Sequence, residues 1–117
     1  MGTVVVGYDY YSDMFYLNMT VGNLQGNITG IHIHRGNSTT NGPVVVVLPA
    51  SNFVQYASDN DSLYYDLFYG DLYVNVHTTA FPGGEIRGQL MSTETGGMIS
   101  LEPNGVASYG RGTGSFH

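Results

Sequence analysis

Residues 14–21, MFYLNMTV, alternate between apolar and polar side chains with a period of two. This alternation places Phe15, Leu17 and Met19 on one face and is typical of a β-strand that is buried on one side. Other short segments, rich in Val, Ile and Tyr and bounded by Gly, Pro or Asn, predict further strands at residues 3–10, 44–49, 72–78, 85–91 and 97–102. Many short strands joined by Gly-rich turns predict an all-β domain, either a sandwich or a barrel.

One segment, residues 61–71 (DSLYYDLFYGD), does not fit the strand pattern. The spacing of Leu63, Leu67 and Phe68 also suits one helical turn, and Gly70 would end it. We therefore expect a short helix or a loop here.

Two parts of the chain differ in composition. Residues 1–103 carry the strand patterns, whereas residues 104–117, NGVASYGRGTGSFH, are rich in Gly and Ser and offer little to bury. We expect one β-domain over residues 1–103, followed by a tail that is flexible or ordered by a partner.

Composition narrows the class of protein. The chain has 117 residues, 42% hydrophobic and 10% charged, which is the balance of a single folded domain. The net charge is -6, lysine is absent, and no cluster of basic residues exists that could bind phosphates. No apolar run approaches the length of a membrane span, and no signal peptide is visible. The sequence therefore predicts neither a nucleic-acid partner nor a membrane span.

Four N-x-[ST] motifs indicate where the protein works. They begin at Asn18, Asn27, Asn37 and Asn60. Such motifs accept N-linked glycans in secreted proteins. Cysteine is absent, so it says nothing of the redox compartment and supplies no thiolate for a metal. We expect an extracellular glycoprotein, either secreted or at the cell surface.

The stretch GIHIHRG, residues 30–36, places two histidines two positions apart. In a strand, residues i and i+2 share a face, so His32 and His34 lie side by side while Ile31 and Ile33 enter the core. Either these histidines are the polar side of a strand, or they are a metal-binding pair.

A third histidine has matching parity in LYVNVHT, residues 72–78, where Val74 and Val76 are the core residues. If the two strands are neighbours, His77 joins His32 and His34 on one patch. Asn75, Glu85 and Arg87 are expected on the same exposed face, where Asn75 or Glu85 can orient an imidazole. Three imidazoles suit copper or zinc and leave a coordination position open.

Alternatives without a metal remain open at this stage. Histidine also occupies exposed strand faces without any ligand, and His32 or His77 can instead hydrogen-bond to the Gly-rich loop at residues 83–84. For Arg87 an ion pair with Glu85 or Asp71 is favoured over guidance of an anion.

Tyrosines are frequent, and several must face outward by parity. Tyrosine faces suit protein contacts, carbohydrate stacking or an ordinary β-surface. The set comprises Tyr8, Tyr10, Tyr11, Tyr16, Tyr64, Tyr65, Tyr69 and Tyr73. There is no calcium-loop motif, no Ser/His/Asp hydrolase signature and no phosphate-binding loop. The sequence leaves enzymatic activity undecided and favours a module without catalysis.

Three blocks, NITGIHIHRG, NGPVVVVLP and GDLYVNVHTTAFPGGEIRGQL, resemble the CHRD (chordin-type) domain in order and spacing. This resemblance covers most of residues 3–91 and implies an extracellular all-β module, a Greek-key β-sandwich or barrel of immunoglobulin-like or superoxide-dismutase-like topology. Catalytic activity is not usually assigned to the family. The segment after Met91 departs from the family's usual end.

A further similarity links IHIH, VNVH and PGGEIRG to the copper half of copper/zinc superoxide dismutase. The chain departs from that pattern because it has no cysteine, no zinc-loop histidines and no obvious fourth copper ligand. His117 can serve only if the tail folds back. The first hypothesis is therefore a self-associating structural or interaction module with a three-histidine metal site. The alternative is a copper-dependent redox protein in which Arg87 attracts a small anion.

Overall fold

The structure is a computed structural model, which describes residues 2–9, 12, 14–37, 40–90 and 97–103. The predicted tail at residues 104–117, with His117, lies outside the described residues, and so do Tyr10 and Tyr11. The division of the chain into a domain and a tail therefore stays a prediction.

The described residues form eight strands and one helix, in an order that follows the sequence pattern closely. The elements are β1 (Gly2–Asp9), β2 (Met14–Val21), β3 (Ile28–Arg35), β4 (Val44–Leu48), β5 (Phe53–Ser58), α1 (Asp61–Phe68), β6 (Leu72–Thr78), β7 (Ile86–Leu90) and β8 (Gly97–Pro103). All the predicted strands are present. The strand β5 was not predicted, although FVQYAS carries a weak alternation.

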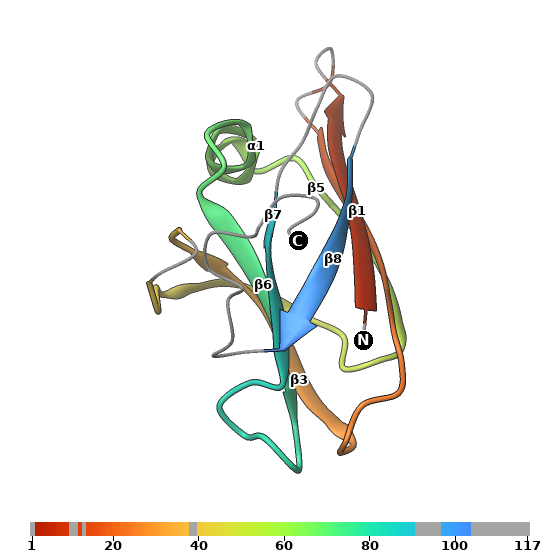
Figure 1. The fold of residues 1–117 in the computed structure, drawn as a ribbon. Coiled ribbons are helices and arrows are strands. Elements are labelled where there is room, and N and C mark those ends of the chain that lie inside the picture. Colours follow the sequence, from red (N-terminus) through yellow and green to blue (C-terminus); the bar gives the residue numbers. More distant parts are fainter. Residues whose placement is uncertain (1, 10–11, 13, 38–39, 91–96, 104–117) are drawn as a thin grey trace.

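All strand pairs are antiparallel, in the order β4-β3-β6-β7-β8-β1-β2-β5. The sheet divides into two layers, one with β1, β2 and β5 and the other with β3, β4, β6 and β7 (Figure 1). The strand β8 joins them, because it pairs with β1 through Gly97–Leu101 and with β7 through Glu102 and Pro103. Since β4 and β5 end the order without pairing with each other, the domain is not a closed barrel.

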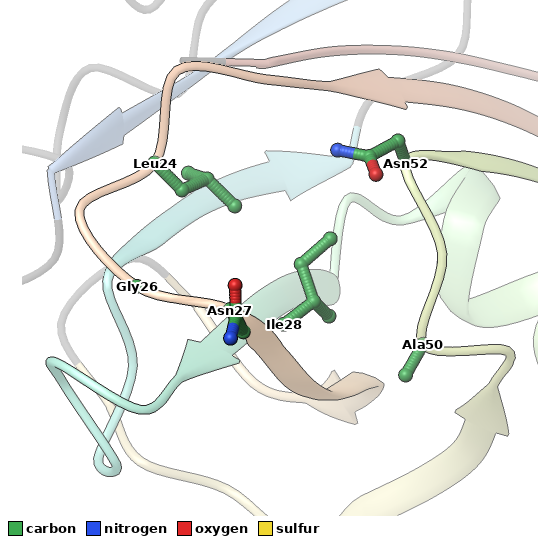
Figure 2. Close-up of a pocket in the computed structure, with 6 residues that line it drawn as sticks. All are labelled: Leu24, Gly26, Asn27, Ile28, Ala50 and Asn52. Atoms are coloured by element: carbon green, nitrogen blue, oxygen red, sulfur yellow. The ribbon is translucent and has the colours of Figure 1, made fainter.

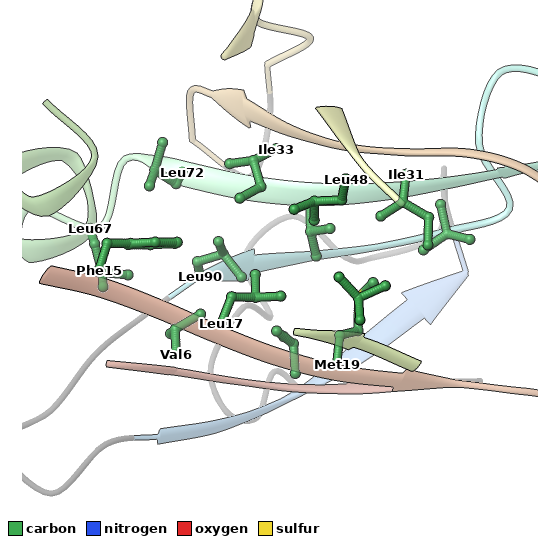
Figure 3. Packing of buried hydrophobic residues seen from close by; sticks show 14 of the residues in the cluster. Val6, Phe15, Leu17, Met19, Ile31, Ile33, Leu48, Leu67, Leu72 and Leu90 are labelled. Atoms are coloured by element: carbon green, nitrogen blue, oxygen red, sulfur yellow. The ribbon is translucent and has the colours of Figure 1, made fainter. Parts of the chain in front are cut away.

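The core lies between the two layers and follows from the alternation within each strand. Phe15 and Leu17 of β2 are fully buried, as are Ile31 and Ile33 of β3. Figure 3 shows these side chains meeting those of the facing layer. Burying each such side chain stabilises the fold by about 1.5–3 kcal/mol. The buried isoleucines therefore determine which face of β3 packs against the core, and the histidines of β3 lie on the outer face.

The segment at residues 61–71 contains the short helix α1, as the sequence allowed. Asn60 caps its first turn, because the Asn60 side chain accepts a hydrogen bond from the Ser62 backbone N–H at 2.8 Å. Gly70 follows the helix with a left-handed φ of 71°. The buried residues are Leu63, Tyr64 and Leu67. Phe68, expected on the apolar face, is instead 58% exposed. No helix among the described residues has the length and apolar character to cross a membrane.

Candidate metal centre

The strands β3 and β6 are direct neighbours, which was the condition for the three histidines to meet. In their register His32 faces Asn75, His34 faces Tyr73, and Gly30 faces His77. The isoleucines of β3 and the valines of β6 enter the core, so these residues lie on the outer face of the layer. The predicted convergence of three histidines is confirmed.

One nitrogen from each of the three imidazoles lies within 4.8 Å of the others. The ring centroids of His32 and His77 are 4.9 Å apart, and those of His32 and His34 are 6.0 Å apart. Gly30 lies opposite His77 without a side chain, and a Cβ there would lie 3.4 Å from Nε2 of His32. Glycine at this position therefore leaves room for the two rings to approach.

Backbone carbonyls orient two of the imidazoles. Nδ1 of His34 lies 2.8 Å from the Gly42 carbonyl oxygen, and Nδ1 of His77 lies 2.9 Å from the Pro82 carbonyl oxygen. A carbonyl oxygen can only accept, so each Nδ1 carries the proton and each Nε2 keeps its lone pair. Both Nε2 atoms are buried and have no hydrogen-bond partner. This is the tautomer in which Nε2 can bind a metal, with the other ring nitrogen held by a carbonyl.

The third imidazole is biased toward its neutral form. Burial lowers the pKa of His32 from its ordinary value, and the neighbouring His77 and His34 lower the same pKa further. Because only a neutral imidazole can donate its lone pair, these effects favour the metal-binding state of His32.

The donor set fits a transition metal. All three donors are imidazole nitrogens, and the group contains no carboxylate or thiolate. Tetrahedral zinc with bonds of about 2.0–2.1 Å needs nitrogens about 3.3 Å apart. Nitrogens as far apart as 4.8 Å must therefore approach by up to about 1.5 Å on binding. Copper also binds imidazole well. The three-histidine group can hold a metal ion.

Tyr73 lies beside the group and connects it to Arg87. The Tyr73 ring stacks on His34, with centroids 4.8 Å apart and 5° between the planes. The Arg87 guanidinium carbon lies 3.7 Å from the centre of the same ring. His34 comes from β3 and Arg87 from β7, which flank β6 on opposite sides, so Tyr73 lies between them.

The placement of Arg87 corrects the sequence-based expectation. Parity put Arg87 on an exposed face, but its side chain is only 6% exposed. The guanidinium instead donates to the carbonyl oxygens of Asn37 and Thr40 at 3.3 and 3.1 Å. Burial lowers the pKa of Arg87, and Tyr73 opposes this shift. The physical reason is the connection between β3 and β4, which folds over this face and could not be located from parity.

The predicted ion pair of Arg87 with Glu85 or Asp71 is wrong. The ion pair that Arg35 of β3 forms with Asp66 of α1, at 2.7 Å, involves none of these three residues. Glu85 accepts hydrogen bonds from the Thr78 hydroxyl and the Gln25 backbone N–H, both at 2.8 Å, and thereby ties together two loops. In the structure Glu85 orients no imidazole.

The carbonyls of Gly42 and Pro82 orient imidazoles, and the sequence did not identify these two residues. The predicted contact between a histidine and the Gly-rich loop does form, but His77 uses the carbonyl of Pro82 rather than residues 83–84. Both groups belong to turns with a recognisable sequence, NGP and FPGG. Asn75 hydrogen-bonds to neither oriented ring, and its buried Oδ1 has no partner.

Other predicted features lie away from the histidines. All four asparagines of the N-x-[ST] motifs are exposed. Tyr16, Tyr65 and Tyr69 are exposed, whereas Tyr64 and Tyr73 are buried.

A pocket of about 400 Å³ opens between the β2–β3 and β4–β5 connections (Figure 2). It is lined by Leu24, Gly26, Asn27, Ile28, Ala50 and Asn52. None of the six carries a titratable side chain, so the pocket offers no acid, base or imidazole.

Fold and site together define a two-layered antiparallel β-domain with a three-histidine group on the outer face of one layer. The family model of the CHRD domain matches residues 1–90, and the chain belongs to this family. No curated protein and no solved structure matches the chain. The comparisons thus lend no support to the similarity with copper/zinc superoxide dismutase.

Proposed function

We propose that this CHRD domain is an extracellular structural or interaction module that binds one copper or zinc ion through His32, His34 and His77. The observation that carries the proposal is the state of His34 and His77: each is held by a carbonyl at Nδ1 and has a buried, unpartnered Nε2. Leaving buried acceptors unpaired costs about 1–3 kcal/mol each, and a metal ion removes that cost.

The proposed role of the ion is to brace the fold. Its ligands come from two strands, and these ligands are anchored to two connections, at Gly42 and Pro82. An ion bound there would cross-link four segments and stabilise the native state over the unfolded chain.

A copper-dependent redox protein is the second function that we consider. It is favoured by the number of protein ligands, because three imidazoles leave one position of a four-coordinate ion open to an exogenous molecule. It is disfavoured by Arg87, which the Tyr73 ring separates from His34 and which donates to loop carbonyls. We therefore rank turnover below a bracing role.

The proposal includes an extracellular location and self-association. The exposure of Asn18, Asn27, Asn37 and Asn60 would allow a glycosylating enzyme to reach them. The order of strands ends at β4 and β5, where Val47 and Phe53 are 72% and 73% exposed. Unpaired strand edges suit pairing with a second copy.

The finer topology is also proposed, as a Greek key of the immunoglobulin or superoxide dismutase type. The support is the path of the chain, which crosses between the layers after β2, β4 and β5.

Metal reconstitution tests the site. Metal-free protein is loaded with copper or zinc, desalted, and assayed for metal per chain by elemental mass spectrometry. We expect one equivalent in the wild type, loss in His32→Ala and His77→Ala, and no change in the control Gln55→Ala, at an exposed position of β5 in the other layer. At a free metal concentration of a hundred times the Kd, metal binding should raise the free energy of unfolding by about 2.7 kcal/mol. A wild type that retains no more metal than His32→Ala would contradict the proposal.

Glycosylation is tested on protein isolated from its natural source, and assembly is tested on recombinant wild type and variants. Intact mass should show glycans on the N-x-[ST] asparagines, and sedimentation should show oligomers that weaken when a charge is placed on the β4 edge by Val47→Lys. Thr3→Lys, on an exposed position of β1 within the sheet, is the matched control. An unmodified and strictly monomeric protein would contradict this part of the proposal.

A further inference from the structure

Asn75 is a buried polar side chain on the histidine face whose carboxamide oxygen no described residue satisfies. Its side chain is 7% exposed, and Oδ1 is enclosed without a hydrogen-bond partner. An enclosed carboxamide oxygen without a partner is costly, and such atoms in native proteins usually mark a missing water, ion or ligand.

Asn75 lies at the centre of the histidine face. It is the direct cross-strand partner of His32, and His77 follows it by two residues on the same side of β6. Directly paired residues have Cβ atoms about 5 Å apart. The Asn75 carboxamide therefore lies next to two of the three proposed metal ligands.

Three side chains near Asn75, those of His34, His77 and Arg87, use hydrogen-bond donors elsewhere. Nδ1 of His34 and Nδ1 of His77 donate to the Gly42 and Pro82 carbonyls. On the other side, Arg87 is paired with Asn75 in the register but donates to the β3–β4 connection. None of these side chains therefore donates to Oδ1, and a ligand held at the histidine group can supply the missing donor.

We propose that Asn75 Oδ1 accepts a hydrogen bond from a protic ligand, water or hydroxide, at the open coordination position of the metal. The inference rests on the proposed metal site. Asn75 is then a positioning residue that makes the site prefer ligands bearing a hydrogen over aprotic anions. Direct ligation by Oδ1 is disfavoured, because carboxamide oxygens suit hard cations such as Ca²⁺ better than ions that choose imidazole.

Azide is the probe that separates these roles, because it is an anion without a hydrogen to donate. Copper(II)-loaded protein is titrated with azide, and the azide-to-copper charge-transfer band gives the Kd, normalised to bound copper. In Asn75→Leu the water loses its acceptor and is displaced more easily, so azide should bind about tenfold more tightly, the equivalent of one hydrogen bond. In Asn75→Asp the acceptor remains and gains a negative charge, so azide should bind more weakly than to the wild type.

A merely structural role of Asn75 would shift the azide affinity of both variants in the same direction. Shifts in opposite directions would therefore exclude that role. Equal azide affinity in all three proteins, or tightening in both variants, would overturn the inference while leaving the metal site intact. A fall of a hundredfold or more in copper affinity in Asn75→Leu would identify Oδ1 as a ligand and overturn it as well. Failure of the wild type to retain copper would instead reject the metal site itself.

Discussion

The imidazole of His34 and the phenol ring of Tyr73 are stacked almost in parallel, 4.8 Å between centroids with 5° between the planes. The same connection, at Gly42, holds both rings: its backbone N–H donates to the Tyr73 hydroxyl at 2.9 Å, and its carbonyl accepts from His34. Tyr73 is 1% exposed, so the stack is enclosed. The direction of His34 therefore depends on a tyrosine and a glycine that touch no proposed metal atom.

Tyr73→Phe should lower the free energy of unfolding by about 1 kcal/mol, because it removes the acceptor of the Gly42 N–H and keeps the ring. Tyr73→Leu also removes the stacking surface and should cost about 2–5 kcal/mol. Denaturant unfolding of the metal-free proteins measures both. Tyr69→Phe is the matched control, since Tyr69 is 75% exposed, and it should stay within about 0.5 kcal/mol of the wild type. Equal losses in Tyr73→Phe and Tyr69→Phe would argue against an enclosed hydroxyl.

Gly42→Ala should weaken metal binding about 10–100-fold, the usual range for a group that orients a ligand. A Cβ on Gly42 would overlap the carbonyl oxygen of Arg35, so the connection must move and carry the acceptor of His34 with it. Competition with a chromophoric chelator measures the affinity. The control is Gly7→Ala, whose new methyl group meets nothing within 4 Å. Unchanged affinity in Gly42→Ala would show that the carbonyl does not orient His34.

Arg87→Met should lower the free energy of unfolding by about 1–3 kcal/mol, because it removes the donors to the Asn37 and Thr40 carbonyls. Metal affinity should change by less than about threefold, since the Tyr73 ring separates Arg87 from His34. Unfolding and chelator competition give the two numbers, and hydrogen exchange should show faster exchange of the amides at residues 40–42. Arg35→Met, which breaks the partly exposed ion pair with Asp66, is the comparison and should cost at most about 1 kcal/mol. A large loss of metal affinity in Arg87→Met would place Arg87 in the site.

Metal-free protein should lose stability as the pH falls below 6.5, the ordinary pKa of His32. The pKa of His32 is lowered in the folded state, so the unfolded chain takes up this proton first. The contribution of His32 is complete above pH 6.5 and is lost as the pH falls toward its folded pKa. Unfolding at a series of pH values measures the slope, which should become shallower in His32→Gln. An unchanged slope in that variant would assign the dependence to other groups.

The site was predictable where it depends on parity within a strand. The Ile-His alternation at residues 31–34 and the Val-x-Val-His pattern at residues 74–77 each determine which side chains face outward. The pairing of β3 with β6 is a contact between distant parts of the chain, which no local pattern reports; the expectation of a trio depended on that pairing and is confirmed.

Parity alone was misleading where a connection covers the face. Tyr73 and Arg87 point away from the core, as expected, but are buried because the β3–β4 connection folds over them. Local pattern was also insufficient to predict which side chains of α1 are buried. Both Tyr64 and Phe68 fit a helical turn, and only the position of α1 relative to the sheet decides that Tyr64 is buried.

The strand β8 has a consequence for how the molecule is made. Its residues Gly97–Leu101 pair with β1, and the whole strand, Gly97–Pro103, lies beyond the segment that the family model matches. Among the described residues, the contact between β1 and β8 closes the longest loop between paired strands, and such distant contacts form late in folding. During synthesis from the amino end, β1 must wait for nearly a hundred residues before this neighbour emerges. Until then its edge is open to other chains, so a nascent domain is more vulnerable to mispairing than a finished one.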